Sequence, residues 1–284
     1  MSELPPIRTS PGETANIPAL RLAVQEALLT GTDEGERIQQ AERLGVAGIE
    51  YNANGLAERV MDICAALEDT PLTAATVHLG WDANFVATEE RVRQQALDQL
   101  RHAMTDAVDI GAGGVVLVPH TGATLGLPDL MPLKAPIQIA VELMTLHLRT
   151  LSDLAYVFGI KLYLQPVNRY VSAFLNHLEQ GVELRRRIKF SEHVLLAADT
   201  YHMSMTEDNP LEALEDASQS IGHLYLVEHN GRLPGTGVVD FATVRETLTD
   251  MVGWAVLTHY TTEADRPRPL ALKRSVTHLQ EAGF

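Results

Sequence analysis

The sequence predicts a single (β/α)8 barrel. Two observations carry this prediction: short apolar runs alternate with helical patterns eight times, and most of the apolar runs stop abruptly on polar side chains. Strands that alternate with helices lie parallel, because each helix returns the chain to the starting edge of the sheet, and eight such units close a barrel. An open doubly wound sheet is the alternative, but no glycine-rich phosphate-binding motif follows the first strand.

The expected elements follow from the periodicity of the apolar residues. Strands are expected at residues 20–25, 47–52, 72–78, 115–118, 161–164, 194–199, 223–227 and 254–259. Helices are expected at residues 33–44, 56–67, 88–110, 137–158, 177–188, 209–220, 240–251 and 270–279. Residues 1–18 contain four prolines and no long apolar run, so we expect a loose lead-in there and the barrel domain over residues 19–284.

Composition limits the classes of function. The chain has 284 residues and a formal net charge of −15, which argues against binding to nucleic acid or to anionic membranes. Its single cysteine, Cys64, excludes an internal disulfide framework. No stretch has the length of a membrane span, and no signal peptide is evident, so we expect a cytoplasmic protein.

Polar side chains collect where the expected strands end. In barrels of this kind the carboxyl ends of the strands form the active site. The side chains at these ends are carboxylates, imidazoles, amides and one guanidinium: Gln25, Glu50, His78, His120, Gln165, Asn168, Arg169, Asp199, His202, Glu228, His229 and His259. For a single histidine a structural role is the better interpretation, but the whole set indicates a site.

Four motifs then resemble one known family. They are residues 46–50 (VAGIE), 165–169 (QPVNR), 199–203 (DTYHM) and 223–237 (HLYLVEHNGRLPGTG). In this order they resemble the xylose isomerase-like TIM barrels, which include sugar-phosphate isomerases, ketose 3-epimerases and hydroxypyruvate isomerases. The resemblance implies a divalent metal held by Glu, Asp, His and Glu at the ends of strands five to eight, with the two Glu residues as acid and base.

The chain departs from that pattern. The corresponding positions are Gln165, Asp199, Tyr225 and either Thr258 or His259. A divalent metal, if one is bound, would be held by Asp199, His202, His259 and the Gln165 oxygen, a donor set that favours Mn, Zn or Fe over Ca. No organic cofactor is indicated.

Three functions remain open. The first is a sugar or polyol isomerase or epimerase that transfers a proton next to a carbonyl. Its candidate acids and bases are His259, Glu228, His202 and Glu50, and its candidate substrate-binding residues are His78, Trp81, His120, Asn168, Arg169 and Tyr225. The second is a lyase or dehydratase using a pair such as Tyr225 and His259. The third is a non-catalytic sugar-binding relative.

Partners follow from the same resemblance. We expect a small-molecule sugar or polyol as substrate, and neither nucleic acid nor membrane. An abasic-site endonuclease is disfavoured, because its metal cluster needs more His and carboxylate ligands than these positions provide. Barrels of this family often form homodimers, so the resemblance implies that a homodimer is possible. No pattern in the sequence identifies an interface.

Overall fold

Eight parallel strands close on themselves in chain order, as the sequence predicts. The computed structural model describes residues 20–260 and 267–284. The strands are β1 (Leu20–Gln25), β2 (Gly48–Asn52), β3 (Thr73–His78), β4 (Gly114–Leu117), β5 (Lys161–Leu164), β6 (Val194–Asp199), β7 (Ile221–Leu226) and β8 (Gly253–Leu257). Every neighbouring pair is parallel, and β8 pairs with β1 to complete the barrel.

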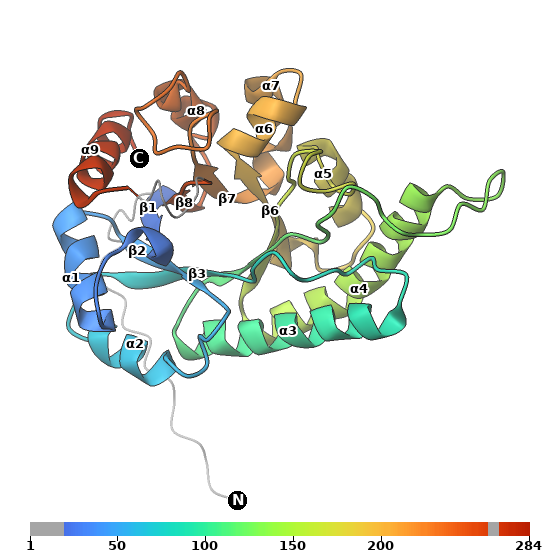
Figure 1. The fold of residues 1–284 in the computed structure, drawn as a ribbon, viewed down its shortest axis with the longest axis horizontal. Helices are drawn as coiled ribbons and strands as arrows, with labels where there is room; N and C mark the ends of the chain where they lie inside the picture. Colours follow the sequence, from blue (N-terminus) through green and yellow to red (C-terminus); the bar gives the residue numbers. More distant parts are fainter. Residues whose placement is uncertain (1–19, 261–266) are drawn as a thin grey trace, which may run out of the picture.

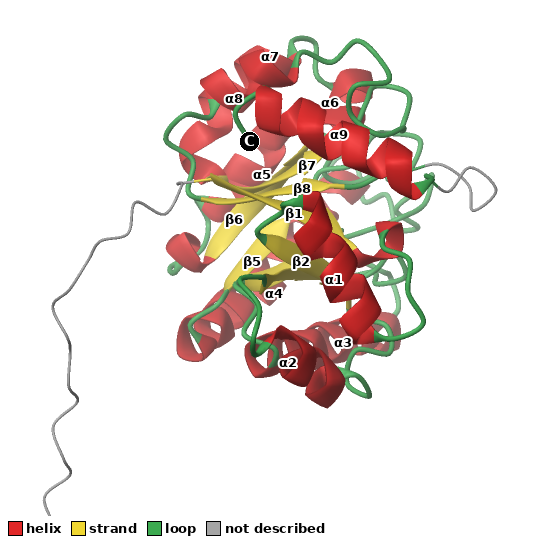
Figure 2. Ribbon diagram, turned by 90° about the vertical axis from the view of Figure 1, so that its left-hand side faces the viewer, coloured by secondary structure: helices red, strands yellow, loops and turns green. Residues whose placement is uncertain are grey.

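Helices surround the strands (Figures 1 and 2). They are α1 (Glu34–Leu44), α2 (Val60–Leu67), α3 (Glu90–Asp109), α4 (Pro136–Phe158), α5 (Leu178–Arg185), α6 (Thr200–Thr206), α7 (Pro210–Ala217), α8 (Phe241–Thr247) and α9 (Pro269–Glu281). As predicted, α1 and α4 end at residues 44 and 158, and the glycine that follows each of them, Gly45 and Gly159, adopts the left-handed conformation. Among the described helices, none combines the length and apolar character that a membrane crossing requires.

The core has two layers. A large apolar cluster lies between the strands and the helices. A smaller one fills the barrel, where small side chains such as Ala23, Ala75 and Ala197 leave room for Tyr163 and Trp254. The interior is therefore solid, and only the carboxyl ends of the strands are left to form a site.

Two elements differ from the expectation at positions that matter for the site. A short helix that was not expected, α6, begins directly after β6, because the Asp199 carboxylate caps it. Strand β8 ends at Leu257, two residues earlier than expected. The expected lead-in, residues 1–18, lies outside the described residues.

Candidate functional site

Asp199 organises the upper part of the mouth. Its Oδ1 accepts hydrogen bonds from the backbone N–H groups of Tyr201 and His202, at 2.9 and 3.1 Å. Its Oδ2 accepts from Gln165 Nε2 at 3.1 Å and from the Tyr260 hydroxyl at 2.5 Å. A carboxylate offers about four acceptor positions, so the hydrogen-bonding capacity of Asp199 is full.

The hydrogen bonds around Gln165 have a defined direction. The backbone N–H of Gly80 donates to His78 Nδ1 at 3.0 Å, so the proton of the neutral imidazole resides on Nε2. That N–H donates to Gln165 Oε1 at 3.3 Å, which leaves the amide nitrogen of Gln165 to face Asp199. Burial lowers the pKa of His78 to about 4, so its ring remains neutral at pH 7.

Tyr260 completes this network, and sequence reasoning overlooked it. The residue is half-buried, and its hydroxyl also lies 3.2 Å from Gln165 Nε2. Burial, together with the neighbouring Asp199, raises the pKa of Tyr260 well above its usual value, so the hydroxyl remains a donor. The alternation of side chains gave a signal, because Thr258 faces the interior and Tyr260 is two residues further on.

His202 has a single defined tautomer. Its Nδ1 accepts from the backbone N–H of Asn168 at 3.3 Å and from Asn168 Nδ2 at 2.8 Å. The orientation of that amide is fixed, because Asn168 Oδ1 accepts from the backbone N–H of Tyr170 at 3.0 Å. Burial lowers the pKa of His202, so the ring is neutral and its proton resides on Nε2.

The Nε2–H of His202 is buried and has no hydrogen-bond partner within residues 20–260 and 267–284. A buried donor without a partner is costly, and at a functional site it indicates a position for a ligand atom. Aromatic rings surround it: Tyr260, Tyr201 and Trp81 have ring centroids 4.9, 5.1 and 6.1 Å from that of His202. Trp81 is half-buried and also contacts the rings of His78 and Tyr260.

A second polar cluster lies deeper in the barrel, around Glu50. The Glu50 carboxylate is fully buried and accepts from the Tyr225 hydroxyl at 2.9 and 3.0 Å, from Thr76 Oγ1 at 2.7 Å and from Gln25 Nε2 at 3.2 Å. The Thr258 hydroxyl donates to Gln25 Oε1 at 2.6 Å, which extends the cluster to the residue that follows β8. Burial outweighs these hydrogen bonds and raises the pKa of Glu50 to about 7.

Two buried residues next to Glu50, His223 and Tyr225, are both uncharged. His223 Nε2 lies 3.4 Å from Glu50 Oε2, but burial lowers the pKa of His223 to about 3. The ring is therefore neutral, and its contact with Glu50 is not a salt bridge. Burial and the adjacent Glu50 raise the pKa of Tyr225 well above its usual value, so Tyr225 stays a hydrogen-bond donor.

The remaining predicted residues differ in their burial and in their partners. His120 is buried, with its Nδ1 3.0 Å from Ser172 Oγ. Arg169 is exposed, and His259 is half-buried just beyond β8. Glu228 is buried and accepts from the backbone N–H groups of Gly235 and Val239, at 3.0 and 3.2 Å, so its carboxylate holds the loop that follows β7.

This loop gives a stability prediction. A Cβ added at Gly237 would lie 2.3 Å from Glu228 Oε2, inside van der Waals contact with a buried carboxylate. We expect Gly237→Ala to lower the free energy of unfolding by about 1–3 kcal/mol, because Glu228 must give up a loop hydrogen bond. Urea denaturation measures the change. In the control Gly113→Ala the nearest atom would be 3.5 Å away, so little change is expected, and equal losses in both variants would contradict the prediction.

The residues present do not fit a divalent metal. At the four positions where the resemblance implies ligands, the chain has an amide, a carboxylate, a phenol and a hydroxyl: Gln165, Asp199, Tyr225 and Thr258. Neutral phenol and alcohol groups are poor ligands for such ions. Within the described part of the chain, no group of three or more His, Cys, Asp or Glu side chains could hold a metal ion.

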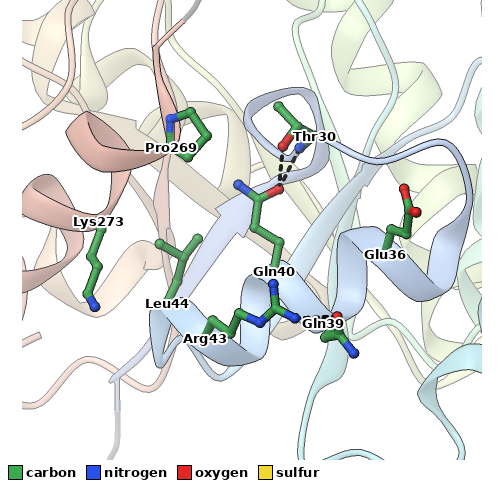
Figure 3. Close-up of a pocket in the computed structure, with 8 residues that line it drawn as sticks. All are labelled: Thr30, Glu36, Gln39, Gln40, Arg43, Leu44, Pro269 and Lys273. Atoms are coloured by element: carbon green, nitrogen blue, oxygen red, sulfur yellow. Dashed lines mark hydrogen bonds between the residues drawn. The ribbon is translucent and has the colours of Figure 1, made fainter.

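A separate pocket lies in the helical layer, between α1 and α9 (Figure 3). Its lining includes Gln40, whose Oε1 accepts hydrogen bonds from the backbone N–H and the hydroxyl of Thr30, and it extends to Pro269 and Lys273. It contains none of the residues of the barrel mouth, so we place the candidate site at the mouth.

The chain as a whole matches one known family. The family model described as xylose isomerase-like TIM barrel matches residues 38–282, and the chain belongs to this family. Among curated relatives, the chain is 29% identical to 3-dehydro-D-guloside 4-epimerase of Escherichia coli (strain K12), over 75% of this chain and 81% of the relative. It is 27% identical to L-ribulose 3-epimerase of Mesorhizobium japonicum, over 72% of this chain and 65% of the relative.

Solved structures agree on the fold. The apo crystal structure of 3-keto-D-glucoside 4-epimerase from E. coli superposes with a TM-score of 0.81 at 24% identity, over 92% of this chain and 99% of that chain. A structure of IOLI protein with a bound zinc atom superposes with a TM-score of 0.73 at 17% identity, over 93% and 96% of the two chains.

Proposed function

We propose that this protein epimerises or isomerises a small sugar or polyol derivative by transferring a proton next to a carbonyl group. The similarity to 3-dehydro-D-guloside 4-epimerase and to ketose 3-epimerases supports this reaction class and a keto sugar or keto glycoside as the substrate. The observation that carries the proposal is the Nε2–H of His202, which is buried, unpartnered among the described residues and fixed in its tautomer.

His202 binds the substrate oxygen in this proposal. A neutral imidazole with its proton on Nε2 donates a hydrogen bond to the carbonyl oxygen, where negative charge develops when the neighbouring carbon loses its proton. Because Asn168 occupies Nδ1 with two N–H donors, the ring is held in place and cannot exchange tautomers without losing both bonds. The donor is therefore ready before the substrate arrives.

Asp199 accepts the proton at Oδ2, once the bound substrate has displaced the Tyr260 hydroxyl that occupies this oxygen in the resting protein. It lies three residues before His202, on the same capped turn, and is the carboxylate that binds Gln165 and Tyr260. The proton leaves carbon for the Asp199 carboxylate, the electron pair of the C–H bond forms a C=C bond to the carbonyl carbon, and the carbonyl π pair moves onto the oxygen to give an enediolate. A proton delivered from solvent to the opposite face of that carbon, with release of the Asp199 proton to solvent, gives an epimer. Transfer of the Asp199 proton to the former carbonyl carbon, with movement of the neighbouring hydroxyl proton to the enediolate oxygen, gives an isomer.

The surrounding residues position these two groups. Gln165 and Tyr260 hold Asp199 Oδ2, and Trp81 offers a half-buried aromatic face on which a sugar ring can stack. Among the other candidates for acid–base work, His259 is half-buried next to Tyr260, while the Glu228 carboxylate is engaged by the loop after β7.

We expect His202→Ala to slow exchange of the substrate proton by about 10²-fold, because the carbonyl oxygen loses its hydrogen-bond donor. Keto sugars and 3-keto glycosides are incubated in D2O, and NMR follows solvent deuterium appearing next to the carbonyl. The matched control is His193→Ala, which removes an imidazole bound to the Ile160 carbonyl, before the amino end of β6. Exchange that is unchanged in His202→Ala would contradict the role of this residue.

Product mass separates this function from its alternatives. An epimer or isomer has the mass of its substrate and carries at most the deuterium taken from solvent. A product that has lost water would instead indicate a dehydratase. Binding of keto sugars in calorimetry, with no deuterium exchange for any of them, would indicate a non-catalytic sugar-binding relative.

A further inference from the structure

We propose that this site does not bind a divalent cation, and that hydrogen bonds of the chain itself occupy all four positions where the family resemblance implies metal ligands. The inference depends on the hydrogen bonding of the resting protein and not on the proposed reaction. It is therefore tested without any turnover measurement.

The first two positions, Asp199 and Gln165, bind each other. Both carboxylate oxygens of Asp199 are fully engaged by donors, so a cation could bind only by displacing Gln165 or Tyr260 from Oδ2. Gln165 presents its amide N–H to Asp199, and its oxygen is turned towards His78. An N–H donor cannot coordinate a cation, and the Gly80 N–H fixes this orientation through the tautomer of His78.

The other two positions, Tyr225 and Thr258, belong to the deeper cluster. The Tyr225 hydroxyl donates to the Glu50 carboxylate, and the Thr258 hydroxyl donates to Gln25, which in turn donates to Glu50. Both side chains therefore serve Glu50, and neither makes a hydrogen bond to Asp199 among the contacts of the described residues. At two positions where the resemblance implies metal ligands, the chain therefore has hydrogen-bond donors that support a buried carboxylate.

His202 is excluded as a substitute ligand for a related reason. A metal binds the lone pair of an imidazole nitrogen, and in His202 that lone pair is on Nδ1 and is already taken by Asn168. The unpartnered Nε2 carries a proton and suits an oxygen atom of a ligand. The hydrogen bonds of Gln165, Asp199, Tyr225 and Thr258 are thus mutually consistent, because each of these side chains has a partner within the chain.

The test measures metal content and metal-dependent stability of the full chain. Protein purified without chelator is analysed for Mn, Fe and Zn, and its melting temperature is compared in EDTA, MnCl2 and ZnCl2. We expect substoichiometric metal and no rise in melting temperature with either salt. A cation bound at this site at 100 times its Kd would raise the melting temperature by about 5 °C.

The overturning result is specific to the site. Stoichiometric metal, or a metal-dependent rise in melting temperature that disappears in Asp199→Asn, would show that a cation binds here and would refute the inference. Asp33→Asn is the matched control, because it makes the same change at another helix cap, where Asp33 Oδ1 accepts from the backbone N–H of Glu36 at 2.8 Å. Loss of the proposed activity alone would leave the metal measurement unaffected, so the two failures are distinguishable.

Discussion

Asp199→Asn is expected to lower turnover on a keto-sugar substrate by about 10³-fold while the barrel remains folded. The amide oxygen can still cap α6, since asparagine is as good a cap as aspartate. The new amide nitrogen, however, takes the place of Oδ2 and faces the Gln165 amide, which is also a donor. The variant therefore loses the proton acceptor and places two donors against each other.

Steady-state kinetics of Asp199→Asn, with circular dichroism to confirm the fold, measures this effect. Asp33→Asn again provides the matched change at a distant cap and should keep full turnover. If Asp199→Asn retains wild-type kcat, Asp199 is not the proton acceptor. If both variants lose activity equally, the loss reflects destabilised helix caps and not chemistry at the mouth.

Glu50 is expected to produce a large pH dependence of stability. Burial raises the pKa of its carboxyl group from 4.5 to about 7, so between these values the folded protein keeps a proton that the unfolded chain has released. Because the folded state binds more protons in this window, the contribution of Glu50 is fully present below pH 4.5 and is lost as pH rises to 7. The total change is about 3 kcal/mol.

The measurement must isolate Glu50, because the buried histidines act in the opposite sense. Burial lowers the pKa of His78 to about 4 and that of His223 to about 3, so their contribution grows as pH rises towards 6.5. The informative quantity is therefore the difference in free energy of unfolding between wild type and Glu50→Gln, from urea denaturation at pH 5 to 8. We expect wild type to lose stability relative to Glu50→Gln over this range.

A matched substitution on the surface provides the control. Glu58→Gln removes a carboxylate from an exposed position, so its difference from wild type should change little over the same pH range. A flat difference for Glu50→Gln as well would show that Glu50 is ionised throughout and that its hydrogen bonds outweigh its burial.

The fold could be predicted from the sequence because it depends on local periodicity. Alternating strands and helices determine the barrel, and the structure brings two of the predicted strand-end residues, Asp199 and His202, into contact. The register of β8 could not be assigned to Thr258 or His259, since a one-residue shift exchanges the two faces of a strand. The structure places Thr258 inward against Gln25, an interaction between residues far apart in the sequence.

The networks of the site were beyond prediction for a physical reason. The amide of Gln165 could present its oxygen or its nitrogen to Asp199, and the choice depends on His78 and Gly80 from another part of the chain. The role of Tyr260 could not be predicted either, because its hydroxyl binds Asp199, which is 61 positions away in the sequence. The pattern alone did not show that Thr76 and His223, in the interiors of β3 and β7, face Glu50.

The cluster around Glu50 also bears on how the two ends of this chain are connected. Its donors come from both ends of the sequence: Gln25 on β1, Thr76 on β3, Tyr225 on β7 and, through Gln25, Thr258 after β8. Loss of the Tyr225 hydroxyl alone would leave a buried acidic group without its phenol partner, which is costly. The cluster around Glu50 therefore connects the first strands of the barrel to the last, so that a substitution on β7 or just after β8 changes the hydrogen bonding of a carboxylate on β2.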